Sequence, residues 1–194
     1  MDATTKQHIS NLYIKDATVR YASFQYLIGR TKEAVDWAYE IWDDLLALTK
    51  KGDNHQRTIA VQLLCNLAKS DPENRMQKDL DTLMIVTKDE KFVTARHSLM
   101  GLWKVAIVNK QLQQLVIDRL EKRYKACIKE KNCTLIRFDI ITVLRKIYDE
   151  VPDEKIKDAA LSWIAKEDDE KYRKKYTGVW KDVANAGKLK SKSP

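Results

Sequence analysis

The stretch Asp53-Asn-His-Gln-Arg57-Thr-Ile-Ala-Val-Gln-Leu-Leu64 decides the fold, because similar stretches recur along the chain. Residues 16–27, 92–103 and 133–144 align with it without gaps. The aligned arginines are 37, 39 and 41 residues apart, and a weaker fifth copy at residues 169–173 follows after 36. A period of this length is typical of stacked helical hairpins. The arginines of the four clear copies are Arg20, Arg57, Arg96 and Arg137.

Each copy carries the apolar pattern of a buried helix. The positions three, four and seven residues after the arginine are apolar in almost every copy, and these offsets share one helix face. Other amphipathic stretches lie between the copies, and we expect them to form the partner helices. The sequence therefore predicts an all-α protein, an α-solenoid (α-α superhelix) of about five helical hairpins. The expected helices span residues 5–14, 17–30, 32–51, 54–69, 72–87, 90–108, 110–131, 133–150, 153–166 and 169–183.

Residues that can cap helices lie at the boundaries of the predicted helices. Asp16, Asp53 and Asp169 precede predicted helices, where a carboxylate can accept hydrogen bonds from free N–H groups of the first turn. Ser70 and Glu73 have the spacing of a capping box, which predicts a helix that begins near residue 72.

Composition bounds the domain organisation. Only 5 glycines and 3 prolines occur in 194 residues, and 44% of the residues are hydrophobic, which favours long helices around a core. We expect one repeat domain over residues 1–183 and a flexible basic tail over residues 184–194. No segment approaches 18 uninterrupted apolar residues, and the N-terminus lacks an apolar core, so we expect neither a membrane partner nor a secretory signal. Three cysteines without CxxC spacing favour the reducing cytoplasm.

The spacing of Asp16, Val19 and Arg20 resembles the signature of HEAT repeats, which belong to the armadillo-like α-solenoids. The resemblance covers roughly residues 16–180. It implies that the second helix of each hairpin lines a concave face, and that aspartates and arginines of adjacent repeats form a ladder of ion pairs. Phe92 and Cys133 stand where the family has aspartate. The resemblance implies a fold and a binding surface, not an activity.

The second helices supply the candidate binding residues. If the apolar stripe is buried, offsets 1, 5, 8 and 12 from each arginine point away from it. Exposed aromatic rings at these positions favour a contact with a partner, although they could instead lean onto the next repeat. The repeated arginines themselves fit structural ion pairs better than ligand contacts. The candidate residues are Tyr21, Gln25, Gln62, Lys69, His97, Lys104, Phe138, Thr142 and Arg145.

Motifs for catalysis or metal binding are almost absent from the sequence. His8, His55 and His97 fall in different predicted elements, and no phosphate loop or nucleophile motif occurs. We therefore expect no enzyme activity, no cofactor and no bound metal. The favoured function is that of a non-catalytic scaffold whose concave face binds a protein or peptide.

Nucleic-acid binding is the alternative function. The net charge of +8 lies entirely in the second half, where residues 101–194 carry 22 basic and 14 acidic side chains. Some DNA alkylation repair glycosylases use HEAT-like solenoids with a basic concave face, and they carry a tryptophan-rich run that ends in a catalytic aspartate. The nearest match here, Ile41-Trp42-Asp43, has a single tryptophan in a predicted first helix. This departure favours protein binding over a glycosylase.

Overall fold

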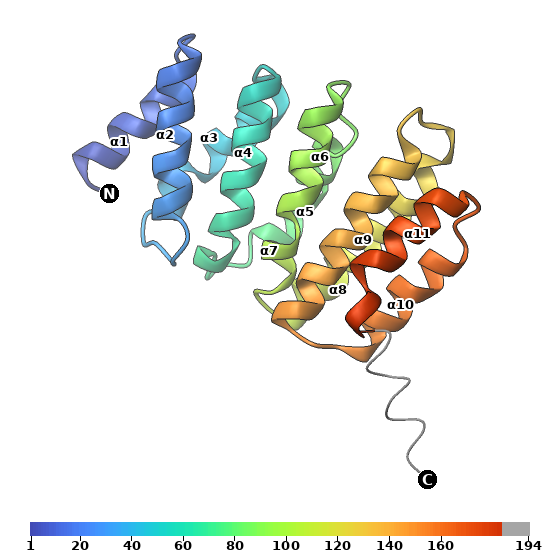
Figure 1. The fold of residues 1–194 in the computed structure, drawn as a ribbon. Helices are drawn as coiled ribbons and strands as arrows, with labels where there is room; N and C mark the ends of the chain where they lie inside the picture. The colour runs from blue at the N-terminus through green and yellow to red at the C-terminus, as the bar shows by residue number, and fades with distance from the viewer. Residues whose placement is uncertain (184–194) are drawn as a thin grey trace. The chain divides into compact units, whose positions relative to one another are not determined.

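A computed structural model describes residues 1–183 and shows only helices and turns over that range, which confirms the all-α prediction (Figure 1). The predicted flexible tail at residues 184–194 lies outside the described residues. None of the described helices is long and apolar enough to cross a membrane.

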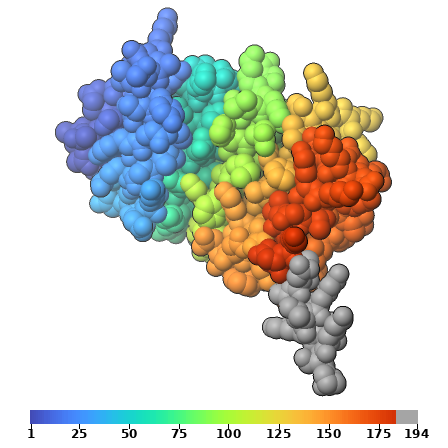
Figure 2. All heavy atoms as spheres, viewed as in Figure 1, coloured from blue at the N-terminus to red at the C-terminus, as the bar shows by residue number. Residues whose placement is uncertain are grey.

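The chain divides into two compact units, residues 1–116 and 117–194, and the boundary falls inside a helix, α8. The single domain expected over residues 1–183 stays a prediction. In Figure 2, the first unit runs in colour from blue to green.

In the first unit, consecutive hairpins stack in two layers. Helices α2, α4 and α6 lie side by side in one layer, while α3 packs against α4 and α5 from the other (Figure 1). Two short 3-10 helices, η1 and η2, follow α1 and α4. The elements are α1 (Ala3–Ser10), η1 (Asn11–Tyr13), α2 (Ala17–Arg30), α3 (Ala38–Lys51), α4 (Asn54–Leu67), η2 (Ala68–Ser70), α5 (Met76–Val86), α6 (Phe92–Gly101), α7 (Trp103–Ala106) and the start of α8 (Lys110–Ala126).

In the second unit, α9, α10 and α11 pack against one another. The closing helix α11 places Tyr176 and Trp180 against α9, and both side chains are fully buried. Tyr176 donates a hydrogen bond to the carbonyl of Thr134, and Trp180 Nε1 donates to that of Ile141. The elements after α8 are η3 (Cys127–Lys129), α9 (Cys133–Glu150), α10 (Glu154–Ala165) and α11 (Glu170–Val179).

The predicted apolar stripe forms the core of both units. In α4 the buried face includes Val61, Leu63 and Leu64, each fully shielded from solvent. The equivalent positions of α9, Ile141, Val143 and Leu144, are buried as completely. Helices flanked by neighbours on two sides bury a wide stripe, which explains why offset 6 from the arginine is buried as well as offsets 4 and 7.

Three of the repeated arginines form ion pairs with the following hairpin, as predicted. Arg20 contacts Asp53 at 2.9 Å, Arg57 contacts Asp89 at 2.6 Å, and Arg137 contacts Glu167 at 2.9 Å. Asp53 has a second role, because it forms a capping box with Gln56 at the start of α4. These pairs tie the second helix of one hairpin to the start of the next second helix.

The acids at two of these pairs are not the ones that the HEAT spacing indicates. In the third repeat, Phe92 occupies the position where the family has aspartate. The partner of Arg57 is instead Asp89, just before α6. Asp169 caps α11 by accepting a hydrogen bond from Tyr172 N, and Glu167 serves as the partner of Arg137.

The predicted starts of two first helices are wrong. Helix α3 begins at Ala38 instead of residue 32, because residues 31–37 form turns in which Val35 N donates to Ser70 Oγ. The Ser70 hydroxyl thus contacts the loop before α3. Asp71 accepts instead from Arg75 N and Met76 N, and α5 begins at Met76.

Candidate binding groove

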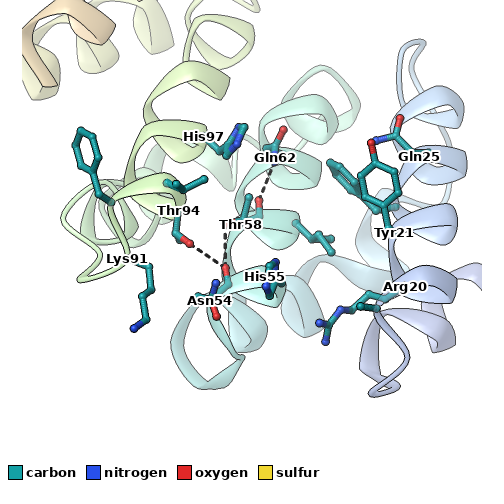
Figure 3. Close-up of a pocket in the computed structure, with 15 residues that line it drawn as sticks. Arg20, Tyr21, Gln25, Asn54, His55, Thr58, Gln62, Lys91, Thr94 and His97 are labelled. Carbon is teal, nitrogen blue, oxygen red and sulfur yellow. Dashed lines mark hydrogen bonds between the residues drawn. The ribbon is translucent and has the colours of Figure 1, made fainter. Parts of the chain in front are cut away.

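A groove of about 770 Å³ opens on the face of the first unit that α2, α4 and α6 share (Figure 3). Its residues come from Ala17–Gln25 of α2, Asn54–Gln62 of α4 and Phe92–His97 of α6, and from Lys91, just before α6. Because the three helices pack side by side, residues from three different repeats line one continuous surface.

Aromatic side chains of α2 form one wall of the groove. The Tyr21 side chain is exposed, with 63% of its surface accessible, and its ring lies 6.4 Å from that of Phe24. Phe24 is buried and forms the floor beside Ile59 of α4. Arg20 lies at the end of the same wall, where Asp53 holds its guanidinium. This wall therefore offers apolar surface and a fixed, already paired cation.

Polar side chains of α4 line the middle of the groove. Thr58 donates to the carbonyl of Asn54 at 2.9 Å, and Gln62 donates to the carbonyl of Thr58 at 3.4 Å. Thr94 of α6 reaches across to the same Asn54 carbonyl at 3.1 Å (Figure 3). The Thr94 contact joins α6 to α4, so one hydrogen bond between repeats helps to fix this part of the groove.

The wall formed by α6 is cationic and apolar. Lys91, Val93 and His97 are all exposed there, and His55 of α4 is exposed on the side of α4 that faces α2. Within the described chain, the fifteen residues that line the groove include no aspartate or glutamate. The groove therefore combines apolar surface with the side chains of lysine, arginine and histidine, whose nitrogens can donate hydrogen bonds.

Four of the candidate residues lie together in this groove: Tyr21, Gln25, Gln62 and His97. Lys69 and Lys104 do not line it. Lys69 Nζ donates to the carbonyl of Lys32, and Lys104 Nζ donates to Asn66 Oδ1. Both lysines instead connect neighbouring hairpins of the first unit.

The other three candidate residues lie in the second unit and contact residues of that unit. The Phe138 ring packs 6.1 Å from the ring of Tyr176, so this ring does lean onto the next hairpin. Thr142 donates to the carbonyl of Phe138, and Arg145 contacts Asp149 and Asp182. The hydrogen bond from Arg145 lowers the pKa of Asp182 to about 2.

The sequence analysis missed the groove residues that lie in the first turns of α4 and α6. Asn54, His55 and Lys91 all precede the repeated arginine, whereas the search followed offsets after it. The signal that could have found them is the parallel course of the second helices, which brings their N-terminal turns to the same edge of the layer.

The candidate glycosylase motif occupies a packed structural cluster. Trp42 is fully buried and donates from Nε1 to Asp79 at 2.8 Å. Asp43 is exposed and forms an ion pair with Arg75. Neither side chain lines the groove. Among residues 1–183, no group of histidine, cysteine and acidic side chains is placed to hold a metal ion.

The comparisons with known proteins give information on the fold only. No protein-family model matches the chain, and no curated protein matches it. One similar solved structure is the crystal structure of an engineered protein determined by the Northeast Structural Genomics Consortium. It is 14% identical, and the match covers 98% of this chain and 87% of that chain with a TM-score of 0.51.

Proposed function

We propose that this protein is a non-catalytic scaffold that binds a protein or peptide in the groove between α2, α4 and α6. The observation that carries the proposal is the exposed Tyr21 ring beside a groove of about 770 Å³. Exposed aromatic side chains are enriched where proteins contact partners. A surface shared by several repeats is also how repeat proteins present extended binding faces.

The proposed architecture is a HEAT-like α-solenoid of about five hairpins with the second helices on the binding face. Two features support it. Second helices pack side by side in the first unit, and arginine–acid pairs join consecutive hairpins in both units. We place the scaffold in the reducing cytoplasm, in keeping with its three free cysteines.

A pair of threonine substitutions tests the proposed function. Thr58 and Thr82 are both half-buried, but Thr58 lines the groove, while Thr82 lines a smaller depression of about 410 Å³ formed by α3, α5 and neighbouring residues. Thr58→Arg should fill the groove, and Thr82→Arg is the matched control. Immobilised wild-type and variant chains are exposed to a lysate of the cells that express the protein, and retained proteins are quantified by mass spectrometry.

The proposal expects at least one protein that wild type and Thr82→Arg retain and Thr58→Arg loses. If all three chains retain the same proteins in the same amounts, the groove is not the binding surface. Thermal melts of both variants establish that they are folded.

Nucleic-acid binding by the basic second half is the weaker candidate. Its support is the charge excess of residues 101–194. Many of these cations already contact acids, including Arg123, Lys125 and Lys174, and such pairing reduces the charge available to phosphates. A duplex DNA that shifts in a gel at low salt and is released at higher salt would favour this candidate.

A further inference from the structure

The groove has two chemically different halves, and their arrangement specifies a ligand. Tyr21, Phe24 and Ile59 supply apolar surface to the half between α2 and α4, which His55 and Gln25 also line. Lys91 and His97 supply nitrogen donors to the half between α4 and α6, beside the apolar Phe92 and Val93. Figure 3 shows Tyr21 on the α2 side, and Lys91 and His97 on the α6 side, with α4 between them.

Charge complementarity indicates what the second half binds. Asp53 and Asp89, which precede α4 and α6, are held by Arg20 and Arg57. The exposed Lys91 is positively charged, and the exposed His97 offers ring nitrogens that can form hydrogen bonds with a carboxylate. Since the lining residues of the described chain include no acid, a carboxylate of a ligand would meet only cationic or neutral groups there.

We propose that the groove binds a peptide segment in which an apolar side chain and one or more carboxylates are separated by about three residues. This inference rests on the proposed function. Neighbouring helices pack about 8–10 Å apart, so the two halves are separated by about that distance. An extended chain rises about 3.3 Å per residue, and three residues span the separation. The apolar side chain packs on Tyr21 and Phe24, and the carboxylates contact Lys91 and His97.

Selection from a random peptide library tests the inference without knowledge of the natural partner. Sixteen-residue peptides displayed on phage are selected against the full chain, and peptides that also bind Thr58→Arg are removed. We expect the remaining sequences to be enriched in aspartate or glutamate near a leucine, isoleucine or aromatic residue. Their affinities are then measured by fluorescence anisotropy with synthetic labelled peptides.

Charge reversal separates the basic half from the rest of the surface. The Lys91→Glu/His97→Glu variant should weaken binding at least about tenfold, because like charges at an interface are strongly unfavourable. Lys78→Glu changes an exposed lysine of α5 outside the groove and is the control, with affinity expected to change less than about twofold. Replacing each glutamate of the peptide by glutamine tests the same contact with the wild-type protein.

The possible outcomes distinguish the two proposals. Groove-dependent peptides that lack acids, or peptides whose affinity is unchanged by both the protein variant and the glutamine replacement, would overturn the acidic-ligand inference and leave the proposed function intact. If every peptide selected on wild type also binds Thr58→Arg, or if none is enriched, the groove does not bind peptides. The acidic-peptide inference then fails, and the proposed function is decided by the lysate experiment with Thr58→Arg and Thr82→Arg.

Discussion

Gly101 illustrates how a single residue fixes the approach of two second helices. A Cβ added to Gly101 of α6 would lie 3.1 Å from Cys65 Sγ of α4, and Cys65 is fully buried. Gly29 of α2 differs, because an added Cβ there would meet nothing within 4 Å. Both glycines are helical, but only at Gly101 would an added methyl group meet a tightly packed neighbour.

We predict opposite effects of alanine at these two glycines. Gly29→Ala should stabilise the protein by up to about 1 kcal/mol through helix propensity. Gly101→Ala should destabilise it by about 1 kcal/mol, because overpacking of about 1–3 kcal/mol outweighs the same gain. Urea unfolding measures both values. Equal stabilisation by the two substitutions would show that Cys65 moves aside freely.

At the residue scale, the offsets after each arginine indicated groove residues inside α2, α4 and α6. Tyr21 and Gln62 were found because they lie one and five residues after an arginine, inside α2 and α4. Lys69 and Lys104 lie beyond Leu67 and Gly101, where α4 and α6 end, and they do not line the groove. Beyond a helix end, the angular spacing of 3.6 residues per turn no longer gives the direction of a side chain.

The aspartates whose ion pairs connect neighbouring helices differ widely in their exposure to solvent. The Asp89 side chain is only 4% exposed and accepts two hydrogen bonds from Arg57, whereas Asp43 is 77% exposed and contacts Arg75. Charged hydrogen bonds that are shielded from solvent contribute more to stability than exposed pairs. The two aspartates therefore form a matched comparison.

Replacing each aspartate by asparagine should separate the two kinds of pair. Asp89→Asn should lower the free energy of unfolding by about 1–3 kcal/mol, and Asp43→Asn should lower it by less than about 1 kcal/mol. Both substitutions keep the side-chain shape. Chemical denaturation gives the values, and similar losses for the two variants would mean that the Arg57 pair does not hold α4 to α6.

The same ion pairs predict how stability depends on pH. Burial tends to raise the pKa of Asp89, but hydrogen bonds from Arg57 and Lys91 N outweigh it and leave the pKa lowered. Arg145 lowers the pKa of Asp182 to about 2. A carboxylate with a lowered pKa in the folded state stabilises above its unfolded pKa of about 4 and loses this contribution as the pH falls through the folded value.

The melting temperature should therefore fall as the pH decreases from about 4 to about 2. The Asp89→Asn variant should lose less over the same interval, because it lacks one of the responsible carboxylates. Thermal melts monitored by circular dichroism at a series of pH values check this. A melting temperature that is constant over the interval would show that these carboxylates do not stabilise the fold.

Element boundaries were predictable where polar caps coincide with the apolar period. Helices α2 and α9 span the predicted residues 17–30 and 133–150. The start of α3 was not predictable from periodicity, because Trp37 is buried from a turn and continues the apolar spacing backward. Tertiary contacts, not local sequence, place this side chain in the core.

At the scale of the whole molecule, the repeat predicted the helical class but not the division into two units. Repeat spacing is a local signal, and it does not report how tightly successive hairpins pack. The unit boundary lies in α8, within the longest interval between repeated arginines, the 41 residues from Arg96 to Arg137. The closing residue Trp180 belongs to the second unit and is fully buried.

Trp180→Ala should destabilise the second unit by about 3–5 kcal/mol, because a large cavity replaces a buried indole that also donates to the Ile141 carbonyl. Hydrogen exchange measured by mass spectrometry should show faster exchange in α9 and α11. Protection of α2, α4 and α6 should be unchanged, because compact units can open separately. An equal rise in exchange across both units would show that they unfold as one.

Amide chemical-shift mapping tests the central claim most directly. The ¹⁵N-labelled chain is titrated with the tightest peptide from the library selection, and shift changes are recorded for every assigned residue. Our account predicts that the largest changes fall at Tyr21, Thr58, Gln62 and His97, which line the groove. Largest changes in α9 to α11, or on the α3 and α5 layer, would contradict it.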